Sequence, residues 1–171
     1  MIISGSYLIK SDFKMCGILG LYSMNGKLEP SQSLIEKSLS YLSKRGPDAS
    51  KVFQNGSVAL GHARLSIQDL SSQGTQPFWD NSKRYCIIYN GEIYNFKSLK
   101  PDLKSKGYQF RSKTDTEVLL YLYIEYGVKC LDMIDGLFSF AIYDNKKNSL
   151  FIARDRFGIK PLVYSLEKGT F

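Results

Sequence analysis

The sequence lacks any apolar run close to the roughly 20 residues that a membrane-spanning helix needs. Residues 1–14 have neither a basic leading region nor a small-residue cleavage site, so they do not form a convincing signal peptide. Cysteine is scarce, and its three occurrences, Cys16, Cys86 and Cys130, are widely separated. An odd number of isolated cysteines suits a reducing compartment better than a disulfide framework. We therefore expect a cytoplasmic protein without membrane contact.

Motifs for cofactors are missing as well. Histidine occurs once, at His62, and there is neither a Cys-x-x-Cys pair nor a pair of carboxylates at metal-ligand spacing, so we expect no metal site. A glycine-rich phosphate loop is absent, which predicts that the chain does not bind ATP by itself. The net charge is +7, but the lysines fall on predicted helix faces and turns. We interpret them as solvated surface and expect no nucleic-acid partner.

The 171 residues, 43% hydrophobic and 13% aromatic, are enough to bury the core of one globular domain. Their patterning predicts an α+β layered fold, in which Pro101 interrupts one helix. The last predicted strand would leave an unpaired edge, so we expect the domain to be incomplete at its C-terminus or completed by another polypeptide. The predicted helices are 31–44, 95–106 and 115–126, and the predicted strands are 17–23, 58–67, 85–89, 136–144, 149–155 and 161–165.

Cys16 lies in the sequence Met15-Cys16-Gly17, which is how a chain begins when its first residue is the nucleophile. An N-terminal cysteine carries a thiol and a free α-amine on one carbon, and an amine that titrates at about 7.7 to 8.0 can act as the base. The alternative is a small buried apolar residue at the start of a strand, which is the commonest state of a free cysteine. Cys86 and Cys130 are interpreted as structural in this sense.

Asn90 and Gly91 directly follow the apolar stretch 85–89. An asparagine amide beside a glycine N–H at a strand end can present two donors to one spot, which is the geometry of an oxyanion hole. The alternative is a tight turn, for which Asn-Gly is a strong local signal. A turn alone would leave Glu92 unexplained.

Two charged residues lie where a partner is needed. Arg64 falls inside the apolar stretch 58–67, so its guanidinium requires a carboxylate, either of a substrate or of a residue such as Asp69. Asp115 lies in Thr-Asp-Thr-Glu, which is typical of a helix N-cap, but an aspartate there could equally face a ligand amine. His62 could serve Cys16 as a base, but a structural role is favoured because an N-terminal nucleophile carries its own base.

Seven motifs occur together, in order, over residues 15–164. With them the chain resembles the class II glutamine amidotransferase domain of glutamine-hydrolysing asparagine synthetases. The motifs are 16–18 (Cys-Gly-Ile), 45–48 (Arg-Gly-Pro-Asp), 61–67 (Gly-His-Ala-Arg-Leu-Ser-Ile), 90–95 (Asn-Gly-Glu-Ile-Tyr-Asn), 114–117 (Thr-Asp-Thr-Glu), 135–138 (Asp-Gly-Leu-Phe) and 153–162 (Ala-Arg-Asp-Arg-Phe-Gly-Ile-Lys-Pro-Leu).

The resemblance implies that residues 15–171 adopt the N-terminal nucleophile hydrolase fold, a four-layer αββα sandwich with two antiparallel sheets. It also implies hydrolysis of glutamine to glutamate and ammonia. Cys16 matches the nucleophile that forms a γ-glutamyl thioester, and Asn90 and Gly91 match the oxyanion hole. The other matches hold the substrate: Arg64 its α-carboxylate, the backbone near Leu65 and Ile67 beside it, and Glu92 and Asp115 its α-amine.

Two departures from the family pattern bear on activity. Met1 to Lys14 precede the nucleophile, and a blocked amine cannot act as base, so we expect processing or, as we favour, translation from Met15. Family members also continue into a synthetase domain that receives the ammonia, and this sequence does not contain it. ATP and Mg²⁺ are therefore expected only in that domain, and the expected partners are glutamine and a synthetase domain or subunit. A homodimer is left open.

The sequence thus predicts the glutaminase domain of an asparagine synthetase-like amidotransferase, acting in asparagine biosynthesis. One alternative is a non-catalytic remnant or interaction subunit that keeps the fold with a buried Cys16. Another is the glutaminase of a different class II amidotransferase, such as a glucosamine-6-phosphate synthase or an amidophosphoribosyltransferase. The motifs at 64–67, 90–95 and 154–161 look closer to the asparagine synthetase branch.

Overall fold

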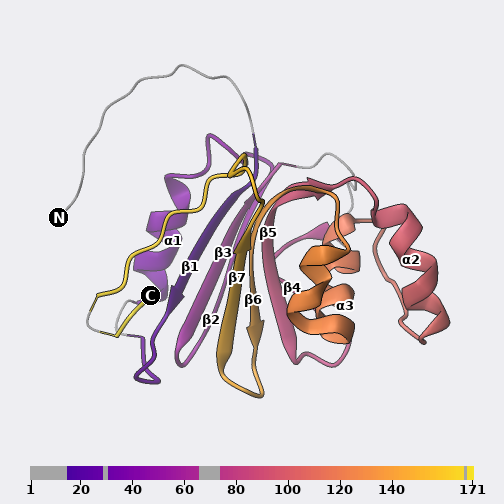
Figure 1. Cartoon of the computed structure of the whole chain (residues 1–171). Coiled ribbons are helices and arrows are strands. Elements are labelled where there is room, and N and C mark those ends of the chain that lie inside the picture. Colours follow the sequence, from indigo (N-terminus) through magenta and orange to yellow (C-terminus); the bar gives the residue numbers. More distant parts are fainter. Residues whose placement is uncertain (1–14, 29–30, 66–73, 168) are drawn as a thin grey trace.

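Two antiparallel sheets stack face to face, and helices lie on their outer sides (Figure 1). This computed structural model describes residues 15–28, 31–65, 74–167 and 169–171. The first sheet has the order β1-β3-β2, with β1 Gly17–Tyr22, β2 Ala49–Asn55 and β3 Val58–Arg64. The second has the order β4-β5-β6-β7, with β4 Phe78–Trp79, β5 Tyr85–Ile93, β6 Gly136–Asp144 and β7 Ser149–Arg154. The predicted α+β class is confirmed.

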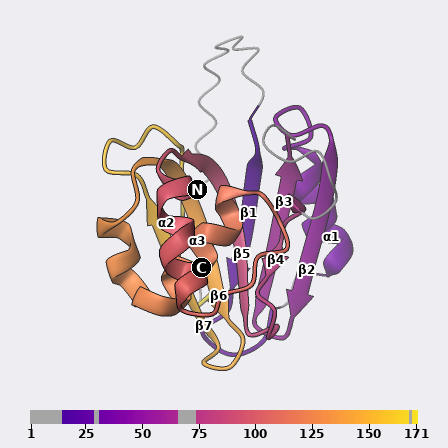
Figure 2. The same cartoon turned by 90° about the vertical axis from the view of Figure 1, so that its right-hand side faces the viewer.

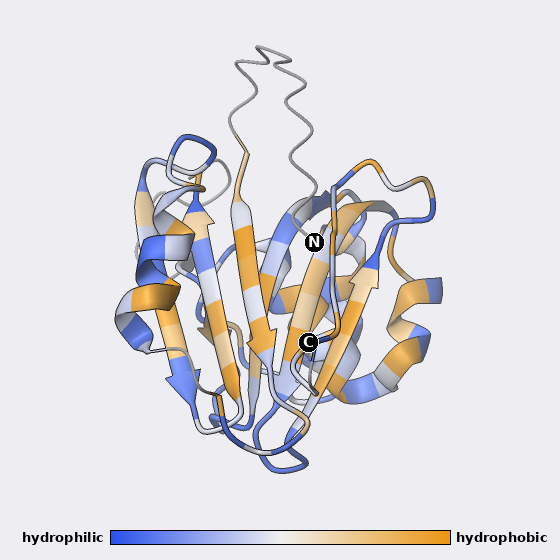
Figure 3. Ribbon diagram, turned by 90° about the vertical axis from the view of Figure 1, so that its left-hand side faces the viewer, coloured by the Kyte–Doolittle hydropathy of each residue, from blue (hydrophilic) through white to orange (hydrophobic). Residues whose placement is uncertain are grey.

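The helices pack through their apolar sides. On the first sheet lies α1, Gln32–Ser40, which buries Ile35 and Leu39 and, apart from the exposed Leu34, carries hydrophilic residues elsewhere (Figure 3). On the second sheet lies α3, Asp115–Tyr126, and Figure 2 views the molecule from this side. Against α3 pack α2, Phe96–Ser105, and the short 3-10 helix η2, Gly127–Asp132. No helix in the described residues combines the length and apolar character needed to cross a bilayer.

Strand alternation decides which side chains enter the space between the sheets. Val58 and Leu60 of β3 pack there against Cys86 and Ile88 of β5, whereas the residues between them face the helices. Continuing the same alternation places His62 and Arg64 of β3, and Asn90 of β5, on the inner faces. The inner space is therefore apolar toward the β6–β7 turn and polar toward the opposite end.

The Asn90-Gly91 turn prediction is wrong, because both residues lie inside β5 and pair with β6. A tight turn forms instead at Asn55-Gly56, where Gly56 and Ser57 join β2 to β3. Gly56 has a φ of 49°, and a glycine at the first position of a two-residue loop matches the twist of a hairpin. The pairing surface offered by β6 outweighs the local signal at Asn90.

Three other local predictions need correction. β2 was not predicted because its alternation is weak, and the strand predicted at 161–165 does not form. Val163 and Tyr164 are exposed there, and no strand in the described residues lies alongside them to supply hydrogen bonds. Pro101 lies inside α2 without breaking it, since the proline is exposed and the carbonyl left without a donor can be hydrated.

Candidate active site

Cys16 lies one residue before β1 and contacts the residue that follows β3. Its Sγ accepts a hydrogen bond from the Leu65 N–H at 3.3 Å and lies 3.6 Å from the Leu65 carbonyl oxygen. The preceding Met15 N–H donates to the Arg45 carbonyl at 2.9 Å. Gly46 makes this approach possible, because a Cβ on it would lie 2.2 Å from the Ala63 carbonyl oxygen. The glycine of the second motif thus allows close packing of the 45–46 backbone on β3 near the cysteine.

Burial raises the pKa of the Cys16 thiol, and it has a larger effect on this pKa than any neighbouring charge or hydrogen bond. The Leu65 N–H, the Arg64 guanidinium and the Lys160 ammonium oppose it by favouring the thiolate, whereas Asp115 adds to the rise. The thiol is half-buried, so it can still be reached from solvent. Three charged residues from distant parts of the chain therefore act on one sulfur.

Gly91 presents its N–H toward the edge of β5 that faces away from β6. It is paired with Phe138 of β6, but the N–H and C=O of Phe138 both bond to Asp155, on the β7 side. In an antiparallel ladder this makes Gly91 and Phe138 a non-hydrogen-bonded pair, so the Gly91 N–H points away from β6. Among the described residues β4 pairs only as far as Ile87, so it does not reach Gly91.

The same edge of β5 carries two other N–H groups whose partners are known. The Tyr89 N–H donates to the Gln76 side-chain oxygen at 2.6 Å, and the Ile93 N–H donates to the Asp115 carboxylate at 2.9 Å. Gly91 lies midway between them. A side chain is excluded at Gly91, because its Cβ would lie 2.3 Å from the Leu137 carbonyl oxygen. Asn90 is buried beside it, with its side chain toward β1 and β3.

Asp115 joins the start of α3 to the end of β5. Its carboxylate accepts hydrogen bonds from the Tyr89 hydroxyl at 2.8 Å and from the Ile93 N–H at 2.9 Å. Burial raises the pKa of Asp115, although these donors oppose the rise. Thr114 occupies the N-cap position but makes no side-chain cap bond, so the capping interpretation of this motif is only partly right.

Glu117, in the first turn of α3, accepts hydrogen bonds from the loop that precedes the helix. Its carboxylate accepts from the Arg111 N–H at 3.0 Å, and from the N–H and hydroxyl of Ser112 at 2.7 Å each. Glu117 is fully buried, so these bonds offset its loss of hydration. Asp115 is thereby left to interact with β5.

The remaining predicted substrate residues take different positions. Arg64 is buried and its Nη1 donates to the Thr75 hydroxyl at 3.3 Å. Glu92 is exposed, and Leu65 supplies the backbone contact to Cys16. Both Ile67 and the alternative partner Asp69 lie outside the described residues. The structure therefore brings Cys16, Arg64, Asn90 and Asp115 to one end of the sheets, with Glu92 at its rim.

His62 is buried between the sheets, and in the described residues neither ring nitrogen has a well-formed hydrogen bond. Burial lowers the pKa of His62 to about 4, the backbone of Tyr89 opposes this, and Arg64 reinforces it. The imidazole is therefore neutral at physiological pH. Its nitrogens make no hydrogen bond to Cys16, whose sulfur is bonded to Leu65.

Supporting residues that the sequence analysis left without a role are Tyr89, Gln76 and Asp155. Tyr89 and Gln76 were overlooked because they carry no motif of their own and act through contacts across the fold. Asp155 could have been noticed, because an aspartate before a glycine-containing turn often bonds to nearby backbone N–H groups. Within the described part of the chain, no three His, Cys, Asp or Glu residues gather as metal ligands.

Residues 15–171 match a protein family described as glutamine amidotransferase domain. The chain belongs to this family. Asparagine synthetase [glutamine-hydrolyzing] 3 of Bacillus subtilis (strain 168) is 43% identical over 159 residues, which cover 92% of this chain and 26% of that protein. Asparagine synthetase B [glutamine-hydrolyzing] of Escherichia coli (strain K12) is 38% identical over 155 residues, which cover 90% of this chain and 27% of that protein.

This class II glutamine amidotransferase domain is thus homologous to the N-terminal region of glutamine-hydrolysing asparagine synthetases. It spans about a quarter of the length of the curated relatives it matches. A solved structure of glutamine phosphoribosylpyrophosphate amidotransferase from B. subtilis matches with a TM-score of 0.59 over 93% of this chain and 35% of that chain. At 22% identity, this likeness shows the shared fold alone.

Proposed function

We propose that the domain hydrolyses glutamine to glutamate and ammonia, with Cys16 as the nucleophile, and that it has the four-layer N-terminal nucleophile hydrolase fold. One observation carries the proposal: the Cys16 thiol, the buried Arg64 and Asp115, and the Gly91 N–H on the edge of β5 that faces away from β6 lie at one end of the two sheets. The asparagine synthetases similar to this chain are themselves named as glutamine-hydrolysing.

The charges around Cys16 suit a zwitterionic substrate. Glutamine carries an α-carboxylate, which we assign to Arg64, and an α-ammonium group, which we assign to Asp115 and Glu92. The Leu65 backbone, which contacts Cys16, lies at the same end. Burial of Arg64 and Asp115 strengthens each interaction, because the local dielectric constant is lower than that of water. A substrate lacking either charged group would lose the corresponding ion pair.

Acylation follows the chemistry of an N-terminal cysteine. The α-amine takes the thiol proton while sulfur attacks the side-chain amide carbon, and the carbonyl electron pair moves onto oxygen. The Asn90 amide and the Gly91 N–H stabilise that oxyanion. When the C–N bond breaks, the amine returns its proton to the leaving nitrogen, which departs as ammonia and leaves a γ-glutamyl thioester. Water then attacks the thioester, releasing glutamate and restoring the thiol.

This mechanism requires Cys16 to be residue one. We therefore propose that Met1 to Lys14 are removed, or that translation starts at Met15 and Met15 is cleaved. The ammonia would pass to a synthetase domain or subunit, as in asparagine biosynthesis, and any ATP and Mg²⁺ would be bound there. Three free cysteines in the described residues are consistent with a reducing compartment such as the cytoplasm.

The test compares two forms of the protein in glutamine-dependent ammonia release. One begins at Cys16 and the other retains residues 1–14, and intact mass identifies the form present in the native host. We expect release only from the form that begins at Cys16. Equal inactivity of both forms, with both folded, would reject the glutaminase and support a non-catalytic remnant that keeps the fold.

A further inference from the structure

The segment that follows β7 is folded by one buried carboxylate. Asp155 Oδ1 accepts hydrogen bonds from the N–H groups of Phe157 at 3.2 Å and Ile159 at 2.9 Å. Its Oδ2 accepts from the N–H groups of Lys160 at 2.9 Å and Phe138 at 3.3 Å. Burial alone would raise the pKa of Asp155, but these four donors lower it, so the group is a carboxylate at neutral pH. The loop 155–160 is therefore fixed to β6.

Arg154 closes the loop from the other side. Its Nε donates to the Lys160 carbonyl at 2.8 Å, and its Nη2 donates to the Gly158 carbonyl at 2.5 Å. Gly158 has a φ of 65°, a conformation that glycine adopts without strain. The backbone of Lys160 is therefore held at both its N–H and its C=O.

With its backbone held in this way, Lys160 extends its side chain to Met15, the residue before Cys16. Its Nζ lies 3.4 Å from the Met15 Sδ, the residue directly before Cys16, although the two are 145 positions apart in the sequence. The motif that contains Lys160 has no role in the proposed mechanism. A cation held beside Met15 is unusual, because a thioether is only a weak acceptor.

The charged groups that act on Cys16 come from three elements. Arg64 at the end of β3 and Lys160 in the loop after β7 favour the thiolate, and Asp115 at the start of α3 disfavours it. Arg64 is assigned to the substrate carboxylate, so its charge is neutralised when glutamine binds. Lys160 has no substrate role, so its charge persists through the reaction.

We propose that Lys160 is a positioning residue whose ammonium group, held beside Met15, favours ionisation of the Cys16 thiol. Its positive charge partly offsets the effect of burial on the thiol. Once Met15 is gone, it lies beside the new α-amine, where repulsion between two cations favours the neutral amine that accepts the thiol proton. Asp155 and Arg154 act by fixing Lys160. The inference rests on the proposed function for its purpose, but the charge effect can be measured without turnover.

The first experiment uses the full chain and measures the rate of Cys16 alkylation by iodoacetamide against pH, with peptide mass spectrometry to identify the modified cysteine. Because only the thiolate reacts, the midpoint of this profile reports the thiol pKa. In Lys160→Met and Lys160→Gln we expect the midpoint to rise by about one pH unit, and in Lys160→Glu by more. Lys160→Arg keeps the charge and should keep the wild-type midpoint.

Lys146→Met is the matched control, because it removes the same charge at the opposite end of β6 and should leave the midpoint unchanged. Cys86, which is fully buried, reports folding in each variant through its protection from iodoacetamide. Raising the salt concentration of wild type should also move its midpoint toward that of Lys160→Gln, because ions screen a partly exposed charge. This measurement needs no variant.

The second experiment follows the α-amine of a chain that begins at Cys16, by NMR titration with labelled cysteine. We expect the amine midpoint to rise by about one pH unit in Lys160→Gln and to stay in place in Lys160→Arg. Unshifted thiol and amine midpoints in the neutral and acidic variants would overturn the proposal. So would a Lys160→Arg midpoint displaced as far as that of Lys160→Gln. If these shifts occur but the wild-type chain that begins at Cys16 releases no ammonia from glutamine, only the glutaminase assignment is rejected.

Discussion

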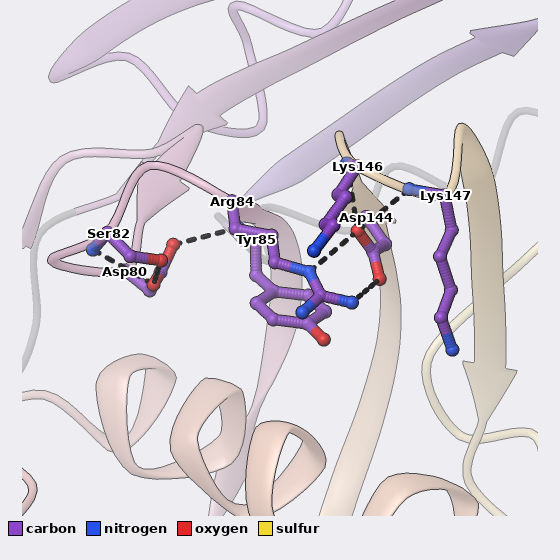
Figure 4. A network of polar contacts seen from close by, with 7 residues as sticks. All are labelled: Asp80, Ser82, Arg84, Tyr85, Asp144, Lys146 and Lys147. Atoms are coloured by element: carbon purple, nitrogen blue, oxygen red, sulfur yellow. Dashed lines mark hydrogen bonds and ion pairs between the residues drawn. The ribbon is translucent and has the colours of Figure 1, made fainter.

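The two ends of the β5–β6 pair carry opposite kinds of polar chemistry. At the end near the β6–β7 turn, Asp144 accepts hydrogen bonds from the Arg84 guanidinium at 2.8 and 3.0 Å and from two backbone N–H groups, and Asp80 accepts from Ser82 and Tyr85 (Figure 4). Asn148 binds both sheets there, through Ser57, Tyr143 and Tyr22.

At the Cys16 end, buried polar groups are not all paired by the protein. Both nitrogens of His62 and the hydroxyl of Ser139, which is paired with Asn90 across the sheet, have no hydrogen-bond partner in the described residues. Buried polar groups are normally paired, and exceptions concentrate at functional sites. One end therefore closes the sandwich through paired polar groups that contribute stability, whereas the end that holds Cys16 keeps buried polar groups whose hydrogen bonding is incomplete.

The sharpest contrast is between two cysteines. In a chain that begins at Cys16, Cys16→Ala should lower glutamine-dependent ammonia release by at least about a thousandfold with little change in stability. Cys86→Ala, in the core between the sheets, should instead lower the free energy of unfolding by about 1–2 kcal/mol and keep the activity of the folded fraction. Equal ammonia release by wild type and Cys16→Ala would break the assignment of chemistry to this end.

His62 gives the next largest effect. Its folded pKa of about 4 is below the ordinary value of 6.5, so the unfolded chain binds more protons between these values and stability falls as pH drops from 6.5 toward 4. We expect wild type to lose about 2–3 kcal/mol more than His62→Gln over this range, measured by urea unfolding. Parallel pH curves for the two proteins would show that His62 is not held neutral.

At the other end, Asp144 should also lose stability as pH falls, but at lower pH and for a different reason. Hydrogen bonds from Arg84 lower its pKa to about 2, so the stability it contributes is complete above about pH 4 and is lost as pH falls toward 2. We expect Asp144→Asn to lower the Tm at pH 7 by about 3–6 °C, and the difference from wild type to vanish near pH 2. A Tm difference that persists at pH 2 would mean that packing, and not charge, explains the loss.

A more exposed ion pair, between Lys106 and Glu125, should have the smallest effect on stability. Lys106 Nζ lies 3.3 Å from Glu125, with both side chains about a third exposed. Lys106→Met should change the Tm by less than about 1 °C, because solvent and salt screen the pair. A change as large as that of Asp144→Asn would show that the network at Asp144 has no special stabilising value.

Local sequence patterns were sufficient to predict the elements whose bounds depend on residues within the same segment. The helix at 115–126 and the hairpin of β6 and β7 agree with the sequence within a residue, because apolar spacing and nearby turn residues define them. Cys16, Arg64 and Asn90 could also be selected from residue chemistry. The tight turn considered at Asn90-Gly91 is wrong because the strand pairing with Ser139 and Phe138 of β6, 49 and 47 positions later, has no local signal.

The sequence by itself determined the family, the α+β class and which residue types could carry the chemistry, because motif order, composition and periodicity are properties of the chain alone. Only the tertiary structure decided that the Gly91 N–H faces the edge of β5 away from β6, that Asp115 bonds to Tyr89 and Ile93, and that Lys160 lies beside Met15. These contacts join distant segments, and their free energy depends on burial and geometry that exist only after the sheets have stacked.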